Sequence, residues 1–349
     1  MRLDIDGRNC ELESGRSILD AVKKEGLDSI MLSDRPLAAQ IGGEVFNLRF
    51  TPKKDTQIHL LRYGEDMGRR VYERTLQFLF ILAMRKEFPR ARVCVRYSLG
   101  PGLFITVDGM EEPFNEEAAL KVETEMRRLV RLKLPLERRR ISIKEALSFY
   151  EQDGQADKAK LLKWRRFSYF DVYQIDGYMD YFYGEMAPDT SYADVFRVKY
   201  VHDGAVVLLM PRSDAPDVPS DYVDLPKLHA VFHQSDEWGK LMECATVNDR
   251  NTHIQNGTIR ELVRINEALH DRGYADIADK IVQKGAKAVL VAGPSSSGKT
   301  TSAHRISTQL RLQGCHPVML SLDDYYIDRD KIERDENGEI DLENINTLD

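Results

Sequence analysis

Alternating apolar and polar positions at the start of the chain predict short β-strands with one helix among them. Residues 2–6 alternate, Gly7-Arg8 provides a turn, and the alternation then resumes. A helical pattern follows, starting after Ser17 and stopping at Gly26. The predicted order is strand, strand, helix, strand, strand, over residues 2–6, 10–13, 18–24, 45–50 and 57–61. This order predicts an N-terminal β-grasp domain over residues 1–62.

The period changes to that of a helix from Glu65, where Val71, Phe78 and Leu82 fall on one side. A pair of strands is predicted next, at 92–97 and 102–107, and Ser142 has the capping-box spacing that begins another helix. We therefore expect an α+β domain over residues 63–210. An acidic stretch rich in proline then begins a linker and helical connector over residues 211–285, in which Thr258 has the same capping-box spacing.

A near-continuous apolar run over residues 288–292 has the composition of a strand buried on both faces of a parallel sheet. A glycine- and serine-rich loop follows it directly, and a helical pattern runs from Lys299 to Gly314. Residues 318–322 repeat the strand pattern. Residues 286–349 are thus predicted to be the start of a parallel α/β domain, and the fold class is α/β and α+β with several domains.

Composition and charge limit the kind of protein more than they define it. The formal net charge of -7 argues against indiscriminate binding to nucleic acid or to an anionic membrane. Four cysteines without a CxxC pair favour a reducing compartment, so a cytoplasmic location is expected. The longest apolar run, residues 78–84, is far shorter than the roughly 20 residues that a membrane span needs, so no membrane partner is predicted.

The loop that opens the last predicted domain has the spacing G-x-x-x-x-G-K-[ST] of a phosphate-binding P-loop. Such a loop bends at its glycines and directs N–H groups and a helix N-terminus at the anion. The residues predicted to bind ATP are Gly293, Ser295, Ser296, Ser297, Gly298, Lys299, Thr300 and Thr301. Lys299 is expected to reach the β- and γ-phosphates and the Thr300 hydroxyl to bind Mg²⁺.

Asp323 follows the second predicted strand, so it is expected at the same sheet edge as the P-loop. A carboxylate there serves as a base or holds the metal through water, although a solvated acidic turn is the alternative.

The P-loop together with Leu320-Ser321-Leu322-Asp323-Asp324-Tyr325-Tyr326 resembles the uridine kinase and phosphoribulokinase family. The resemblance implies an ATP-dependent phosphotransferase that transfers the γ-phosphate to a nucleoside 5'-hydroxyl, with uridine as the first candidate. It implies catalytic roles for Lys299 and for Asp323 as the base, and nucleoside binding by Asp323 and Tyr326. Tyrosines at a strand end also commonly serve only in packing. The chain ends soon after this motif, so we expect the fragment itself to be inactive.

Residues 1–210 resemble the N-terminal region of threonyl-tRNA synthetase, a TGS domain followed by an editing domain. The full domain order resembles bacterial nucleoside kinases with a synthetase-like extension. The histidine and cysteine positions of the editing family fall here on Glu73, Gln77, Phe182 and Met186. Phenylalanine cannot bind a metal and methionine is a poor ligand for a zinc hydrolase, so we expect no editing activity.

The alternative to the kinase is a non-catalytic regulatory module that binds nucleotide or RNA. A basic stretch could contact RNA phosphates, although arginines on a helix face are usually only solvated. The stretch comprises Arg127, Arg128, Arg131, Lys133, Arg138, Arg139 and Arg140. The run Trp164-Arg165-Arg166, with Phe167 and Tyr169, could stack a base or fill a core. His229 and His233 are spaced as a metal pair but lack a convincing third ligand. No pattern indicates an oligomeric state.

Overall fold

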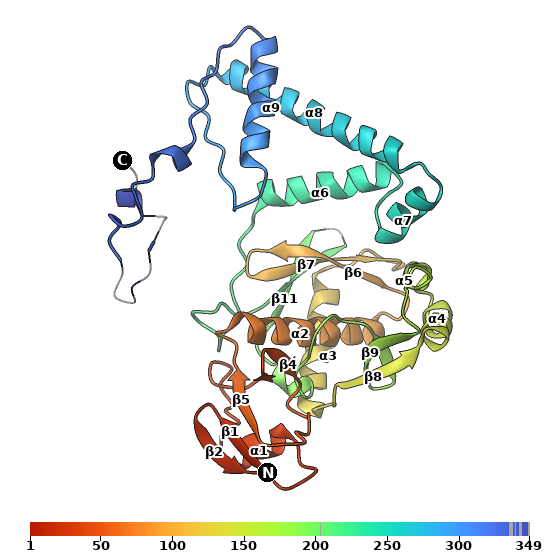
Figure 1. The fold of residues 1–349 in the computed structure, drawn as a ribbon. Helices are drawn as coiled ribbons and strands as arrows, with labels where there is room; N and C mark the ends of the chain where they lie inside the picture. Colours follow the sequence, from red (N-terminus) through yellow and green to blue (C-terminus); the bar gives the residue numbers. More distant parts are fainter. Residues whose placement is uncertain (203, 335–337, 339, 342–343, 348–349) are drawn as a thin grey trace. The chain divides into compact units, whose positions relative to one another are not determined.

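The structure is a computed structural model that describes residues 1–349 except 203, 335–337, 339, 342–343 and 348–349 (Figure 1). It divides into two compact units, Met1–Trp238 and Gly239–Asp349. No helix of the described residues is long and apolar enough to cross a membrane. The division of the chain into four predicted regions is finer than these two units and stays a prediction.

The first unit begins with a five-stranded sheet and the helix α1 (Ile18–Lys24). The strand order is β2-β1-β5-β3-β4, in which only β1 and β5 are parallel. The helix starts where predicted because Ser17 and Asp20 form a reciprocal capping box. The strands are β1 (Arg2–Ile5), β2 (Arg8–Glu11), β3 (Ala38–Ile41), β4 (Glu44–Phe46) and β5 (Thr56–Leu61). The predicted order is therefore present, with β3 as an additional strand.

Next comes an antiparallel four-stranded sheet, in the order β11-β12-β7-β6. Leu103, Ile105 and Val107 on one face join the core that includes α2 and α3, while Phe104, between Leu103 and Ile105, joins a separate cluster on the other face. The elements are α2 (Asp66–Glu87), β6 (Arg92–Leu99), β7 (Gly102–Asp108), α3 (Glu116–Leu132), β11 (Arg197–His202) and β12 (Ala205–Leu209). Alternate residues of one strand thus serve opposite faces of the sheet.

A small antiparallel sheet, in the order β10-β9-β8, lies with two short helices and a core of its own. Its elements are β8 (Glu137–Ser142), α4 (Ile143–Gln152), α5 (Ala156–Leu162), β9 (Tyr169–Ile175) and β10 (Tyr178–Asp180). The predicted helix start is confirmed, because the Ser142 hydroxyl accepts a hydrogen bond of 3.1 Å from the Glu145 N–H. A short 3-10 turn, η1 (Thr190–Tyr192), leads from this sheet to β11.

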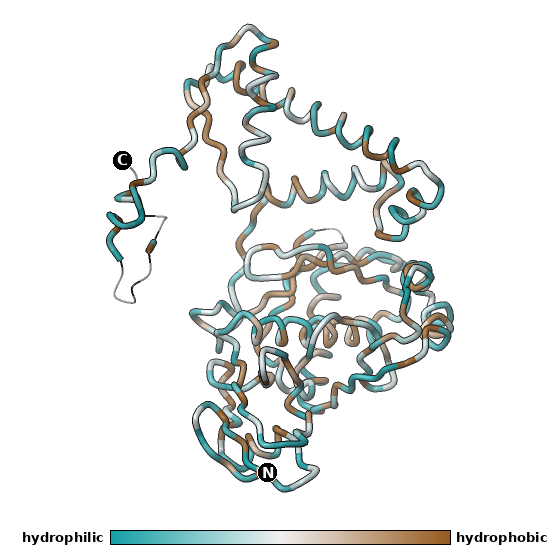
Figure 2. The backbone as a smooth tube through the Cα atoms, viewed as in Figure 1, coloured by the Kyte–Doolittle hydropathy of each residue, from teal (hydrophilic) through white to brown (hydrophobic). Residues whose placement is uncertain are grey.

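Helix α6 (Pro226–Leu241) crosses the boundary between the units, and its first part packs within the first unit. The Phe232 ring stacks on Tyr97 of β6, with ring centroids 4.2 Å apart. The second unit contains α7 (Val247–Gln255), α8 (Ile259–Lys284), α9 (Lys299–Leu312) and the 3-10 turns η2 (Leu322–Tyr325) and η3 (Ile345–Thr347). Its small core joins α8 to α9 through Ala278, Ile306 and Leu310. Figure 2 shows largely hydrophilic residues along α8.

The predicted parallel α/β domain over residues 286–349 is not formed in the described part of the chain. Residues 288–292 and 318–322 contain no β-strand, and Leu290 and Val318 are 94% and 84% exposed. Strand backbone needs hydrogen-bonded neighbours, and no described strand pairs with either segment. The prediction of a capping box at Thr258 is also wrong. Helix α8 begins where predicted, but the Thr258 hydroxyl does not cap it and lies 2.8 Å from His253 Nδ1.

The start of α2 is set by a close approach between Gly68 and the backbone of Arg62. A Cβ atom on Gly68 would lie 1.9 Å from the Arg62 carbonyl oxygen and 2.6 Å from its carbonyl carbon. The connection also holds Glu65, whose carboxylate accepts a hydrogen bond of 2.9 Å from the Arg62 N–H. Only glycine fits at position 68 without moving the backbone that joins β5 to α2.

We expect Gly68→Ala to destabilise the first unit by about 1–3 kcal/mol, because backbone atoms cannot yield as a side chain does. The matched control is Gly64→Ala in the same connection, where an added Cβ meets nothing within 4 Å, so a change within about 0.5 kcal/mol is expected. Urea unfolding followed by tryptophan fluorescence measures this unit alone, since Trp164 and Trp238 both lie in it. Equal urea midpoints of unfolding for the two variants would show that the backbone relieves the close approach without loss of stability.

Candidate functional site

The four residues at the positions of the editing family's metal ligands lie together around α2; they are Glu73, Gln77, Phe182 and Met186. On the helix, the Gln77 side-chain amide donates a hydrogen bond of 3.0 Å to the Glu73 carboxylate. The segment 181–187 lies beside it: the Phe182 ring packs on Phe78 at 5.2 Å between centroids, and Met186 is fully buried. Each of the four side chains is therefore hydrogen-bonded or packed against apolar neighbours.

An arginine holds this segment to the helix. Arg74 Nη1 donates a hydrogen bond of 2.8 Å to the Glu185 carbonyl. Gly184 has a φ of +109°, and a Cβ there would lie 2.7 Å from Arg74 Cζ, so the guanidinium fills the space that a side chain would take. The Tyr173 hydroxyl donates a hydrogen bond of 2.9 Å to the Glu185 carboxylate, which also forms an ion pair with Arg138. A network of charged and polar groups thus lies beside the positions of the expected metal set.

Burial shifts the pKa of two charged groups in this region. Burial raises the pKa of Glu73 above its usual range, and burial lowers the pKa of Arg74, which remains charged at neutral pH. A zinc hydrolase instead needs three nitrogen, sulfur or carboxylate ligands around an open position. Among the residues that the structure describes, no three His, Cys, Asp or Glu side chains are grouped to hold a metal ion.

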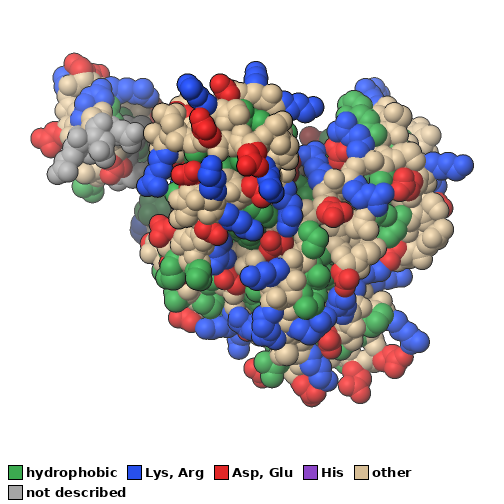
Figure 3. Space-filling view, turned by 90° about the horizontal axis from the view of Figure 1, so that it is seen from below, with side chains coloured by type: hydrophobic (Ala, Val, Ile, Leu, Met, Phe, Trp, Pro, Cys, Tyr) green, Lys and Arg blue, Asp and Glu red, His purple; other side chains and the backbone are tan. Residues whose placement is uncertain are grey.

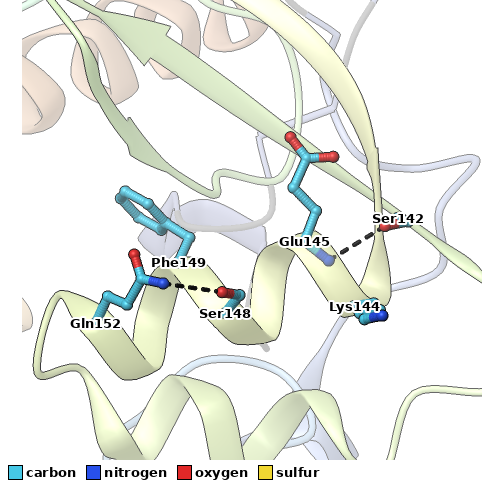
Figure 4. A pocket seen from close by; sticks show the side chains of 6 residues that line it. All are labelled: Ser142, Lys144, Glu145, Ser148, Phe149 and Gln152. Atoms are coloured by element: carbon cyan, nitrogen blue, oxygen red, sulfur yellow. Dashed lines mark hydrogen bonds between the residues drawn. The ribbon is translucent and has the colours of Figure 1, made fainter.

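Two hollows lie in the described surface, and neither forms a convergent site. One, of about 420 Å³, lies along α4 (Figure 4). Its hydrogen bonds stay within the helix and its cap: Glu145 N–H to Ser142, and the Gln152 amide to Ser148 at 3.1 Å. The other, of about 430 Å³, has Glu73, Arg69 and Arg212 in its wall, and both arginines pair with neighbouring aspartates.

His229 and His233 do not act as a metal pair in this structure. His229 Nδ1 lies 2.7 Å from the Tyr97 hydroxyl, and its Nε2 lies 3.1 Å from His202 Nε2, so both ring nitrogens are engaged. Burial lowers the pKa of His229, and the neighbouring His202 and His233 lower it further. The neutral ring belongs to the contact between α6 and the sheet.

The P-loop residues form a tight turn before α9. Ser296 and Gly298 have φ values of +60° and +85°, and a Cβ on Gly293 would lie 2.8 Å from the Ser297 hydroxyl. Lys299 Nζ donates hydrogen bonds of 2.8 and 3.0 Å to the carbonyls of Gly293 and Pro294. No side chain of the described residues caps the helix. The first N–H groups of α9 therefore have no side-chain acceptor, which is a property of anion-binding helix starts.

The residues around the P-loop are placed less favourably for catalysis. Thr300 and Thr301 lie in the first turn of α9, and Ser295 lies in the loop before it. Asp323 is exposed in the turn η2, and Tyr326, just after it, is 39% exposed. Lys299 contacts the carbonyls of its own loop rather than Asp323. Because the predicted strand before Asp323 is missing, a shared sheet edge does not bring this aspartate to the loop.

Most arginines of the basic stretch are paired with acidic or amide groups. The partners are Glu123 for Arg127, Glu125 for Arg128, Asp171 and Glu185 for Arg138, Gln174 for Arg139, and Asp171 for Arg140. Arg131 and Lys133 are exposed. Figure 3 shows Lys and Arg interspersed with Asp and Glu over one face. Such pairing disfavours a continuous basic surface over this stretch.

The segment after α5 is different, because Phe167 is 60% exposed. Its ring lies 5.7 Å from that of Tyr169, and Arg165 lies 5.5 Å from the Phe167 centroid. The sequence allowed either core packing or base stacking for this aromatic run. An exposed ring beside a guanidinium favours base stacking.

Comparisons with known proteins match threonine–tRNA ligases. That of Clostridium kluyveri is 25% identical over 194 residues, 55% of this chain and 30% of the relative. Those of Carboxydothermus hydrogenoformans and Acetivibrio thermocellus are 27% and 28% identical over 175 and 160 residues, 48% and 45% of this chain. The chain spans 24–30% of the length of these relatives. No protein-family model matches the chain.

These relatives confirm the resemblance to threonyl-tRNA synthetase and overturn the prediction of a nucleoside kinase. The relatives compared are ligases for tRNA, not phosphotransferases of the uridine kinase and phosphoribulokinase group. The P-loop and the motif around Asp323 cover only a short part of the chain, whereas the similarity to the ligases covers 45–55% of it. The alternative, a module that binds RNA or nucleotide, agrees better with the comparisons.

The residues that sequence reasoning missed are Arg74, Gly184 and Glu185. Arg74 directly follows Glu73, Glu185 directly precedes Met186, and Gly184 lies two residues from both Phe182 and Met186. An arginine directly beside Glu73 and a glycine before Glu185 were the available signals. Their contact depends on tertiary packing between α2 and the segment 181–187.

We predict that the purified protein contains well below one zinc per chain, because Glu73 and Gln77 bond to each other and Phe182 and Met186 lack suitable ligand atoms. Elemental analysis after purification without added metal measures this directly. About one zinc per chain, lost in Glu73→Ala but kept in the control Glu112→Ala at an exposed position, would contradict the account.

Proposed function

We propose that the chain is a non-catalytic module that binds RNA and, through its P-loop, the phosphates of a nucleotide. The observation that carries this proposal is that hydrogen-bonded, buried and arginine-held side chains fill the positions that correspond to the editing family's metal ligands. A scaffold that keeps its packing but lacks a metal set retains surface for binding without means to activate water.

RNA as the ligand is supported by the relatives, whose names state an action on tRNA. We infer a TGS-like β-grasp domain over residues 1–62 and a degenerate editing-like domain over residues 63–210. The overall charge of -7 requires that RNA be held by a local group of cations rather than by the whole surface. The thiols of Cys10, Cys94, Cys244 and Cys315 are free, which supports a reducing, cytoplasmic location.

For the nucleotide, ATP with Mg²⁺, we propose the loop Gly293–Thr301 as the phosphate-binding element. The uncapped start of α9 and the positive φ of Gly298 support it. Lys299 would exchange its two carbonyl acceptors for phosphate oxygens, a charge-assisted contact that is stronger than a bond to a neutral carbonyl. Thr300 would offer its hydroxyl to the metal ion.

We expect Lys299→Ala to weaken binding of Mg-ATP about tenfold or more, or about 1.4 kcal/mol, through loss of this charge-assisted contact. Lys287→Ala is the matched control, since it removes the same charge from an exposed position in the same segment. Isothermal titration of the full chain with ATP and Mg²⁺ gives both affinities. If the two variants weaken binding equally, the loop is not the phosphate site.

We expect the full chain to bind tRNA with a Kd that rises with salt, as contacts to phosphates require, and to release no additional ADP when uridine is added with Mg-ATP. Fluorescence anisotropy and a coupled ADP assay on the same preparation test the two parts. Absence of tRNA binding at low salt would contradict the RNA-binding function. Uridine-dependent ADP release would restore the kinase in place of a non-catalytic module.

A further inference from the structure

We propose that an unpaired nucleotide of RNA stacks on an exposed aromatic and cationic surface, the Phe167 platform, formed by Arg140, Arg165, Arg166, Phe167 and Tyr169. This inference rests on the proposed RNA-binding function and names the surface that performs it. The residues come from β8, from the segment between α5 and β9, and from the start of β9 (Figure 1).

Phe167 is a large apolar side chain that the fold leaves open. It is 60% exposed, whereas Phe170, three residues further on, is buried in the core beneath α4 and α5. The Phe167 and Tyr169 rings lie 5.7 Å apart with an interplanar angle of 43°, so they form one edge of aromatic surface rather than a stacked pair. Contiguous exposed apolar surface that is rimmed by polar residues is a feature of interaction sites.

Cations are fixed around these rings by bonds within the sheet. Arg140 Cζ lies 4.1 Å from the Tyr169 ring centroid, and its guanidinium is anchored to Asp171 by hydrogen bonds of 2.8 and 3.0 Å. Arg165 Nε donates a hydrogen bond of 3.0 Å to the Tyr169 carbonyl. This bond holds the Arg165 guanidinium 5.5 Å from the centroid of the Phe167 ring. Little side-chain entropy remains to be lost when a ligand binds such anchored groups.

Two further cations of the segment are exposed and lack a carboxylate partner in the described structure. Arg166 directly precedes Phe167, and Lys163 lies one turn earlier at the end of α5. A phosphate on either side of a base stacked on Phe167 would lie within reach of these flexible side chains. The platform therefore offers the aromatic face and the positive charge that proteins use for single-stranded nucleic acid.

Unpaired RNA fits this surface better than a duplex does. Bases of a duplex are stacked on each other and present only their edges, whereas a single strand presents a base face. The platform lies on the loop after α5 and the start of β9, beside Arg140 of β8. Stacking on one aromatic residue favours any base, so little sequence preference is expected.

The test is anisotropy with labelled oligoadenylate as the single strand, a blunt RNA duplex and bulk tRNA, using the full chain. Phe167→Ala should weaken oligoadenylate binding about tenfold, within the range for loss of one base stack, whereas Phe167→Trp should retain the affinity. Arg166→Gln should weaken binding and lower the slope of log K against log salt by about 1. Tyr183→Ala is the control, because Tyr183 is 76% exposed and lies outside the platform.

The outcomes separate this inference from the function on which it rests. Binding of tRNA that Phe167→Ala leaves unchanged overturns the platform and leaves the RNA-binding function intact. A preference for the duplex over oligoadenylate does the same. Failure of the wild-type chain to bind any of the three RNAs overturns both. An equal loss in Phe167→Ala and Tyr183→Ala would show that exposed aromatics act without a defined site.

Discussion

The contact between the Arg74 guanidinium and Gly184 holds together the part of the first unit where the chain's sheets meet. A side chain at position 184 would displace Arg74, and without Arg74 the Glu185 carbonyl loses its donor. The same segment contacts the chain just after β4 of the N-terminal sheet. The Asn47 amide donates a hydrogen bond of 2.9 Å to the Met186 carbonyl, and Arg49 Nε donates one of 2.9 Å to the Pro188 carbonyl. The segment 181–188 is thus fixed from several elements, and its position defines both neighbouring surfaces.

We propose that this arrangement lets a chain similar in sequence to part of the threonine–tRNA ligases keep its packing without a hydrolytic metal site. A metal ion joins segments through strong bonds to a few ligands, and its loss would leave buried charges unpaired. Here Arg74, Arg138 and Glu185 join the same segments by hydrogen bonds and ion pairs instead. The surface outside this network includes the Phe167 platform, for which we propose RNA binding.

The local elements of the first unit could be predicted from sequence because their signals are local. The Ser17 and Ser142 caps and the two strands around Gly100 lie where the patterns indicated. The strands predicted at 288–292 and 318–322 are absent because a strand depends on neighbours that its own sequence does not contain. Likewise, the sequence pattern around Phe167 is compatible with either a core or a surface position. The packing of α4 and α5 on Phe170 decides that Phe170 is buried and Phe167 is exposed.

Ultraviolet crosslinking of the full chain to bulk tRNA, followed by peptide mass spectrometry, tests the central claim of RNA binding by a non-hydrolytic scaffold most directly. Crosslinks form only where a base lies against a side chain, so they report position as well as binding. The account predicts crosslinked peptides that contain residues 163–169, within the first unit. Crosslinks confined to residues 286–349, or their absence from Met1–Trp238, would contradict it.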